Sequence, residues 1–203
     1  MLIAMGHTVY GERIRKDFPN ILVYPEFFDS KKDLLRRNYH IYLRKLWSLR
    51  STIKIAIYPD YIYYKLQVPD NVEYIIPAHS LSKDVIKICR ELSSFTKVWL
   101  GFASNEKYRD YEIADFVEFA KRLNAKTWYL GISTKRELRE AVKWNFEGID
   151  ITTMLLGEFE QIGDYNYVRR KITELLGHTK AQGRQTRITE FLSVNSPVNV
   201  VTR

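Results

Sequence analysis

Seven short apolar runs, separated by longer segments, constrain the fold of this chain more than any other feature. They are rich in β-branched and aromatic residues and are apolar nearly throughout. The runs are LIAM (2–5), ILVYPEF (21–27), IKIAIYPD (53–60), VEYIIPAH (72–79), VWLGFAS (98–104), TWYLGIS (127–133) and GIDITTM (148–154). Strands with both faces covered have this pattern, which is typical of a parallel sheet packed between helices.

Helical patterns lie between several of these runs. They cover residues 31–50, 82–95, 110–125 and 133–145. Ser82 and Ser133–Thr134 are typical N-cap residues for the second and fourth of these helices. The alternation predicts an α/β protein, a compact (β/α) barrel of the TIM type with short or missing helices near its start. An open doubly wound parallel sheet is the alternative.

The composition sets the domain organisation. The chain has 203 residues, of which 45% are hydrophobic and 28% charged, a balance typical of a soluble globular protein. We expect a barrel domain over residues 1–177 and a flexible tail over 178–203, because the tail combines Gly, Pro, Ser, Thr and Asn with few apolar residues. No apolar run is long enough to span a bilayer, so no membrane partner is expected.

The cysteine count and the absence of common motifs narrow the function. The single cysteine, Cys89, excludes an intrachain disulfide, and the N-terminal segment lacks a signal-peptide pattern, so we expect a cytoplasmic location. One Cys and four His also argue against a structural zinc site. Neither G-x-G-x-x-G nor G-x-x-x-x-G-K-[ST] occurs, which removes the main support for a dinucleotide or P-loop nucleotide site.

Polar residues at the ends of the predicted strands are the best guide to a site. Ligands of parallel α/β folds bind at the carboxyl ends of the strands, and a closed barrel would gather such residues on one rim. The candidates are Glu26, Asp60, His79, Asn105, Glu106, Ser133, Asp150 and Thr152.

Asp60, His79 and Asp150 are the catalytic candidates within this group. Two carboxylates and an imidazole could carry out general acid–base chemistry or bind a divalent metal. Asp60 follows Pro59 and could instead stabilise a turn, and His79 could be a loop residue. Asp150 lies inside a strand pattern, where an acid is disfavoured, which favours a functional role.

Positive charge is concentrated in two segments. The net charge is +8, yet residues 31–54 contain eight Lys or Arg against one acid, and residues 165–203 contain seven against two. Such concentrations indicate a polyanionic partner, DNA or RNA. The alternative is a solvated helix face and a soluble tail.

The first basic segment interleaves cations with aromatic residues. Phosphates pair with basic side chains, and bases stack on aromatic rings. The expected nucleic-acid-binding residues are Arg36, Arg37, Arg44, Lys45 and Arg50, interleaved with Tyr39, His40, Tyr42 and Trp47. The aromatic residues could instead pack in the core, leaving the arginine face free.

The segment TWYLGISTKRELREAVKWNFEGIDITTM (127–154) has the pattern of a late strand–helix–strand unit of a (β/α) barrel. With IAIYPDY (55–61), it resembles the tRNA-guanine transglycosylase group, including viral relatives that modify DNA. The resemblance covers residues 53–155 and implies a barrel that acts on nucleic acid. The family's Asp-Ser-Gly-Gly segment and cysteine-rich zinc site are absent, so no catalytic residue is carried over.

The tail contains a short motif, Gln185-x-x-Ile188-x-x-Phe191-Leu192. In one helical turn, Ile188, Phe191 and Leu192 would share a side and fit a hydrophobic groove, while the Gln185 amide would enter a polar pocket. The motif resembles the peptide that docks replication and repair proteins on the sliding clamp, PCNA. The alternative is a short amphipathic helix that folds back on the domain.

Two classes of function follow from these observations. In one, a clamp-docked barrel enzyme, possessing transglycosylase-like or other activity, acts on nucleic acid or a nucleobase through its strand-end carboxylates during DNA replication or repair. In the other, the barrel is a non-enzymatic module and the tail regulates the clamp, as in a virus or mobile element.

Overall fold

The computed structural model describes residues 1–29, 33–34, 36–158 and 160–177. The chain forms two compact units, Met1–Gly157 and a second unit that begins at Glu158. The described part of the second unit contains the 3₁₀-helix η2 (Gln161–Gly163) and a helix over residues 165–177. The clamp-motif residues Gln185, Ile188, Phe191 and Leu192 lie outside the described residues.

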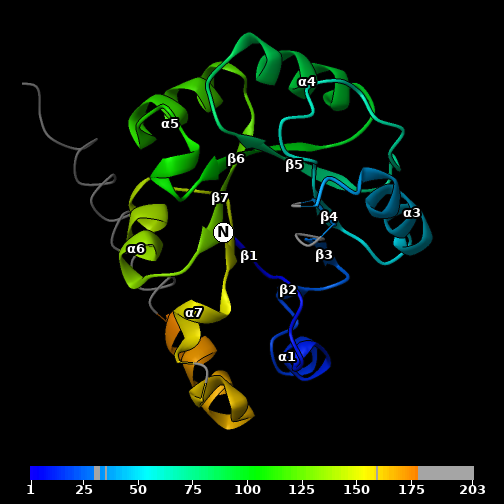
Figure 1. The fold of residues 1–203 in the computed structure, drawn as a ribbon. Helices are drawn as coiled ribbons and strands as arrows, with labels where there is room; N and C mark the ends of the chain where they lie inside the picture. Colours follow the sequence, from blue (N-terminus) through cyan, green and yellow to red (C-terminus); the bar gives the residue numbers. More distant parts are fainter. Residues whose placement is uncertain (30–32, 35, 159, 178–203) are drawn as a thin grey trace, which may run out of the picture. The chain divides into compact units, whose positions relative to one another are not determined.

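One eight-stranded parallel sheet forms the centre of the first unit (Figure 1). Its strands are β1 (Leu2–Met5), β2 (Ile21–Val23), β3 (Phe27–Phe28), β4 (Ile55–Ile57), β5 (Glu73–Ala78), β6 (Val98–Ala103), β7 (Lys126–Ile132) and β8 (Gly148–Ile151). Their order in the sheet is β2-β1-β8-β7-β6-β5-β4-β3, and every neighbouring pair is parallel.

The two edge strands of this sheet are consecutive in the chain. β2 pairs with β1 and β3 pairs with β4, and only Tyr24, Pro25 and Glu26 separate β2 from β3. The predicted run 21–27 is therefore divided, with its first part on one edge of the sheet and its second part on the other. The sheet is nearly closed into a barrel, which confirms the predicted (β/α)-barrel class.

Helices connect most of the strands on the outside of the barrel (Figure 1). They are α1 (Gly11–Asp17), α3 (Tyr39–Leu49), α4 (Lys83–Ser93), α5 (Ile113–Arg122) and α6 (Lys135–Lys143), with the 3₁₀-helix η1 (Glu106–Tyr108). The short helix α7 (Thr153–Leu156) follows the last strand, β8. Ser82 caps α4, where its hydroxyl accepts from the Val85 N–H at 3.4 Å. Thr134 caps α6 in a capping box with Glu137. Both predicted helix starts are confirmed.

The predicted helix over residues 31–50 is interrupted. Arg37 has a φ of 55°, the left-handed conformation that ends a helical turn. The Arg37 N–H donates to the Leu34 carbonyl at 3.0 Å, and the Asn38 N–H donates to the Asp33 carbonyl at 2.9 Å. This is the bonding pattern of a Schellman cap, so α3 begins only at Tyr39.

Trp128 on β7 fills the interior of the barrel. Its ring stacks on Phe27 of β3 with centroids 5.6 Å apart, although β3 and β7 are not neighbours in the sheet. It also meets Trp99 of β6 edge to face at 5.4 Å. Gly148, its partner in register on β8, leaves the necessary space, since a Cβ there would lie 2.1 Å from a Trp128 ring carbon.

Gly148→Ala is therefore expected to destabilise the protein by about 3 kcal/mol or more, because the added methyl group has to displace a packed indole. Chemical denaturation measures the effect. Gly11→Ala is the matched control, since its nearest neighbours would be 4.0 Å away, and it should change stability by less than about 0.5 kcal/mol. Equal stability of the two variants would contradict this packing.

Candidate functional site

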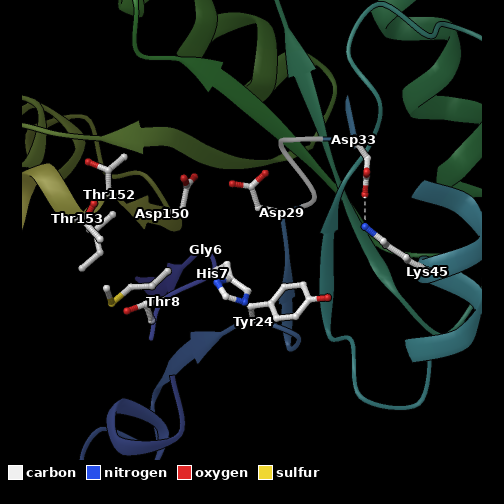
Figure 2. Close-up of a pocket in the computed structure, with 12 residues that line it drawn as sticks. Gly6, His7, Thr8, Tyr24, Asp29, Asp33, Lys45, Asp150, Thr152 and Thr153 are labelled. Carbon is white, nitrogen blue, oxygen red and sulfur yellow. Dashed lines mark hydrogen bonds and ion pairs between the residues drawn. The ribbon is translucent and has the colours of Figure 1, made fainter. Parts of the chain in front are cut away.

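A cavity of about 680 Å³ opens at the carboxyl ends of β1, β3 and β8 (Figure 2). This is the end of the strands at which ligands bind in (β/α) barrels, and the volume is typical of small-molecule sites. The cavity is lined by Met5, Gly6, His7, Thr8, Tyr24, Asp29, Asp33, Lys45, Asp150, Ile151, Thr152 and Thr153.

Asp150 is a buried carboxylate of this pocket, with only 7% of the residue exposed. One of its oxygens accepts from the Trp128 indole N–H at 2.8 Å, and the other accepts from the Gly131 backbone N–H at 3.0 Å. Gly131 has a φ of 68° and lies where the β7–β8 register shifts. This bulge turns the Gly131 N–H toward Asp150, so the local strand geometry fixes the carboxylate.

Asp29, which follows β3, supplies a second carboxylate. A Cβ on Gly6, at the end of β1, would lie 3.4 Å from an Asp29 side-chain oxygen. The Asp29 carboxylate therefore lies close to the end of β1, and a methyl group at position 6 would be in ordinary van der Waals contact with it. Asp29 and Asp150 both point into the cavity from different strands (Figure 2).

The other walls of the pocket add rings and a charged pair. The His7 and Tyr24 rings lie side by side with centroids 5.3 Å apart. On the α3 side, the Lys45 ammonium pairs with the largely buried Asp33 carboxylate at 2.6 Å. The pocket thus holds three carboxylates, one ammonium group and one imidazole, and it suits a ligand that offers N–H or O–H donors.

The Thr152 hydroxyl is a further polar group in the pocket wall. Its oxygen is buried and has no hydrogen-bond partner in the described part of the chain, whereas its backbone N–H donates to the Ile132 carbonyl at 2.8 Å. The sequence singled out this residue, and the structure places it beside Asp150.

Asp60 and His79 lie together in another part of the barrel. The His79 Nε2 atom is 3.2 Å from an Asp60 oxygen, and its Nδ1 atom is 2.7 Å from the Tyr108 carbonyl. Tyr61 stacks on the imidazole with centroids 4.3 Å apart. β7 and β6 separate β8 from β5, which His79 follows, and neither Asp60 nor His79 lines the pocket of Asp150. The structure therefore joins two of the three catalytic candidates and leaves Asp150 apart.

The surroundings of His79 favour its protonated form. Burial lowers the pKa of His79. The hydrogen bonds to Asp60 and the Tyr108 carbonyl, together with the charge of Asp60, raise this pKa by more than burial lowers it, so it lies above the ordinary value of 6.5. Both ring nitrogens are in contact with acceptors. The imidazole of His79 thus links the loop after β4, which carries Asp60, to the loop after β6, which carries Tyr108.

The remaining strand-end candidates have structural contacts. Glu26 pairs with Lys54 at 2.7 Å and with Arg15 at 3.5 Å. Asn105 caps η1, and Glu106 pairs with Arg109 at 3.5 Å. Ser133 and Thr134 both donate to Glu137 at the start of α6.

The basic residues of the first segment lie on the surface. Arg36, Arg37, Arg44 and Arg50 are exposed, and Lys45 reaches the pocket. The aromatic residues divide, since Tyr42 is buried and donates to the Ile57 carbonyl at 2.5 Å, whereas Trp47 is exposed. The core-packing interpretation thus holds for Tyr42 and not for Trp47.

Asp29, Gly6 and His7 were missed in the sequence. The strand-end prediction names Glu26 in the run 21–27, whereas β3, the second strand formed from this run, ends at Phe28, and Asp29 follows it. Gly6 and His7 directly follow the first run, so the strand-end rule could have found both.

The described residues also bear on metal binding, membrane crossing and thiol chemistry. They contain no group of three or more His, Cys, Asp or Glu arranged to hold a metal ion. No helix in the described ranges has the length and apolar character needed to cross a membrane. Burial raises the pKa of the Cys89 thiol to about 12, which disfavours the nucleophilic thiolate.

These features define a barrel-like α/β domain with a carboxylate-lined pocket at the carboxyl ends of its strands. The chain belongs to the same family as the uncharacterized protein ORF192 of Acidianus two-tailed virus. The two sequences are 40% identical over 190 residues, which is 91% of this chain and 96% of the relative. No family model matches the sequence, and no solved structure matches it.

The raised pKa of His79 predicts a pH-dependent contribution to stability. The stabilisation is complete below the pKa of an unfolded histidine, about 6.5, and is lost as the pH rises through the higher folded value. His79→Gln should therefore lower the free energy of unfolding more at about pH 5.5 than at about pH 9. His40→Gln, an exposed residue on α3, is the control and should show a small loss at both pH values. An equal loss for His79→Gln at both pH values would argue against the ion pair.

Proposed function

We propose that the barrel is an enzyme that acts on a nucleobase or nucleoside unit of nucleic acid, with its active site in the pocket of Asp29 and Asp150. The observation that carries the proposal is the pair of carboxylates that enter one cavity from different strands at the carboxyl ends of the barrel. Polar groups at this end of such barrels perform the chemistry of the fold.

The lining of the pocket supports a base-containing ligand. Carboxylates accept hydrogen bonds from the amino and imino groups of a base and from sugar hydroxyls. The neighbouring His7 and Tyr24 rings offer apolar faces, and an extruded base is held by stacking and by hydrogen bonds to its edge. The exposed arginines near α3 would hold phosphates.

The chemistry that suits two carboxylates is cleavage or exchange of a glycosidic bond. In such reactions one carboxylate stabilises or attacks the anomeric carbon, and the other protonates the departing group. Asp150, fixed by the Trp128 and Gly131 N–H groups, suits the first role, and Asp29 suits the second. The sequence resemblance to base-exchanging barrels supports this class of reaction and not the choice of the two residues.

Asp150→Asn tests the active site because it keeps the size of the side chain and removes its charge. We expect wild-type protein to bind a member of a nucleobase and nucleoside panel in titration calorimetry. Release of free base from nucleic acid should fall at least about a hundredfold in the variant. Asp60→Asn, an aspartate outside the pocket, is the control and should retain activity. Unchanged activity of Asp150→Asn would refute the assignment.

We also propose that the tail docks the protein on the sliding clamp, PCNA, as the Gln185-x-x-Ile188-x-x-Phe191-Leu192 spacing suggests. If the barrel proves inactive, this docking is the basis of the alternative function, a non-enzymatic clamp regulator. The support is the sequence motif and its flanking cations, Lys180, Arg184 and Arg187, which suit an acidic rim.

A peptide covering Lys180 to Pro197 is expected to bind the clamp by itself, because it contains all three apolar anchors and the motif needs no support from the barrel. Phe191→Ala should weaken binding by about thirtyfold or more, and Gln185→Ala should weaken it less. Titration calorimetry of the three peptides against the clamp measures the effect. Equal affinities of the wild-type and Phe191→Ala peptides would exclude the docking mode.

A further inference from the structure

Two exposed aromatic residues lie on surface elements that are fastened together. Trp47 on α3 is 42% exposed, and Tyr64 in the connection between β4 and β5 is 58% exposed. The Trp47 indole N–H donates to the carbonyl of Gln67, three residues after Tyr64, at 3.1 Å. Trp47 is therefore oriented by a hydrogen bond while part of its ring stays open to solvent.

The connection that carries Tyr64 is held in place by its own contacts. The Tyr58 hydroxyl donates to the Tyr64 carbonyl at 2.7 Å and accepts from the Leu66 N–H at 2.9 Å. The Asn71 amide donates to the carbonyl of Arg50, just after α3, at 2.9 Å. The aromatic side chains thus extend from a preorganised backbone, which reduces the entropy lost on binding.

Exposed cations lie on the elements that carry Trp47 and Tyr64. The Arg50 guanidinium lies 5.7 Å from the centroid of the indole ring, and Arg44 is exposed on the same helix. Lys65, next to Tyr64, is also exposed. Of the acids in the connection, Asp60 pairs with His79, and Asp70 is exposed. The surface next to α3 therefore combines positive charge with accessible rings.

We propose that Trp47, Tyr64, Arg44 and Arg50 form a binding surface for single-stranded nucleic acid. Unpaired bases stack on the two aromatic rings, and phosphates pair with the two guanidinium groups. A duplex cannot use the rings in this way, because its bases are already stacked and paired.

The helix that carries part of this surface also contributes a residue to the pocket wall. α3 carries Lys45, whose ammonium group pairs with Asp33 in the pocket wall. The same helix therefore contributes to both places, and we infer that the substrate of the enzyme is a nucleotide within a single strand. This last step rests on the proposed function, whereas the binding surface does not.

The test is fluorescence anisotropy of full-length protein with a labelled oligothymidylate of about 15 nucleotides. Trp47→Ala should weaken binding about tenfold, and Tyr64→Ala should weaken it several-fold. Replacing both Arg44 and Arg50 with Ala should reduce the slope of log affinity against log salt by about 1.4. A duplex with one oligothymidylate strand should bind at least about tenfold more weakly and should not respond to Trp47→Ala.

Trp144→Ala is the matched control. Trp144 follows α6 and also has a cation beside its ring, Lys143 at 5.9 Å. This variant should bind the oligonucleotide as wild type does. Equal affinity of wild type for single strand and duplex, or equal effects of Trp47→Ala and Trp144→Ala, would overturn the proposal.

Asp150→Asn separates this proposal from the proposed function. The variant should lose base release and keep its affinity for the oligonucleotide, because Asp150 lies in the pocket and not on α3. Binding that depends on Trp47, in a protein that releases no base, would sustain the binding surface and refute the enzyme. Loss of oligonucleotide affinity in Asp150→Asn would overturn the proposal that the binding surface is separate from the pocket.

Discussion

The hydrogen bond from the Trp128 indole to Asp150 joins the packing of the barrel to its pocket. The same ring stacks on Phe27 across the interior, and its space is provided by Gly148. A buried carboxylate is costly unless donors satisfy it, and Trp128 and the Gly131 N–H are such donors. The residue that fills the barrel is therefore also a residue that positions a buried acid of the pocket. A substitution of Trp128 is therefore expected to affect both the packing of the barrel and the position of the Asp150 carboxylate.

The sequence could predict the strands and several helix starts because these depend on local patterns. Strands covered on both faces are apolar throughout, and Ser82 and Thr134 cap helices through contacts within a few residues. The division between β2 and β3 depends instead on pairing with distant strands, and the break at Arg37 uses a left-handed residue that is not glycine. Pro25, which cannot donate to a strand ladder, marks the division of the run, whereas nothing in the neighbouring sequence marks the break at Arg37.

The sequence predicts the kind of site, polar groups at strand ends, but only some of the residues that share the pocket. The rule that polar groups follow strands found Asp150 and Thr152, but Asp29 was missed because the end of its strand was misplaced. Position around the ring was the second difficulty, since His79 follows β5 and Asp150 lies on β8. Every strand end in a parallel barrel meets the same rim. Which of them share a cavity depends on sheet order, which a single sequence does not contain.

The unpaired junction between β2 and β3 has a consequence for how a ligand would act on the protein. In the described sheet the chain passes from one edge to the other through Tyr24, Pro25 and Glu26, without backbone bonds between the two edge strands. Tyr24 and Asp29 flank this junction and line the pocket together with Gly6 of the β1 end and Asp150 of β8. A ligand that contacts all four residues would connect the two edge strands of the described sheet, which are not paired with each other. Part of the binding free energy would then stabilise the folded state. The free energy of unfolding would therefore rise as more of the protein is bound to the ligand.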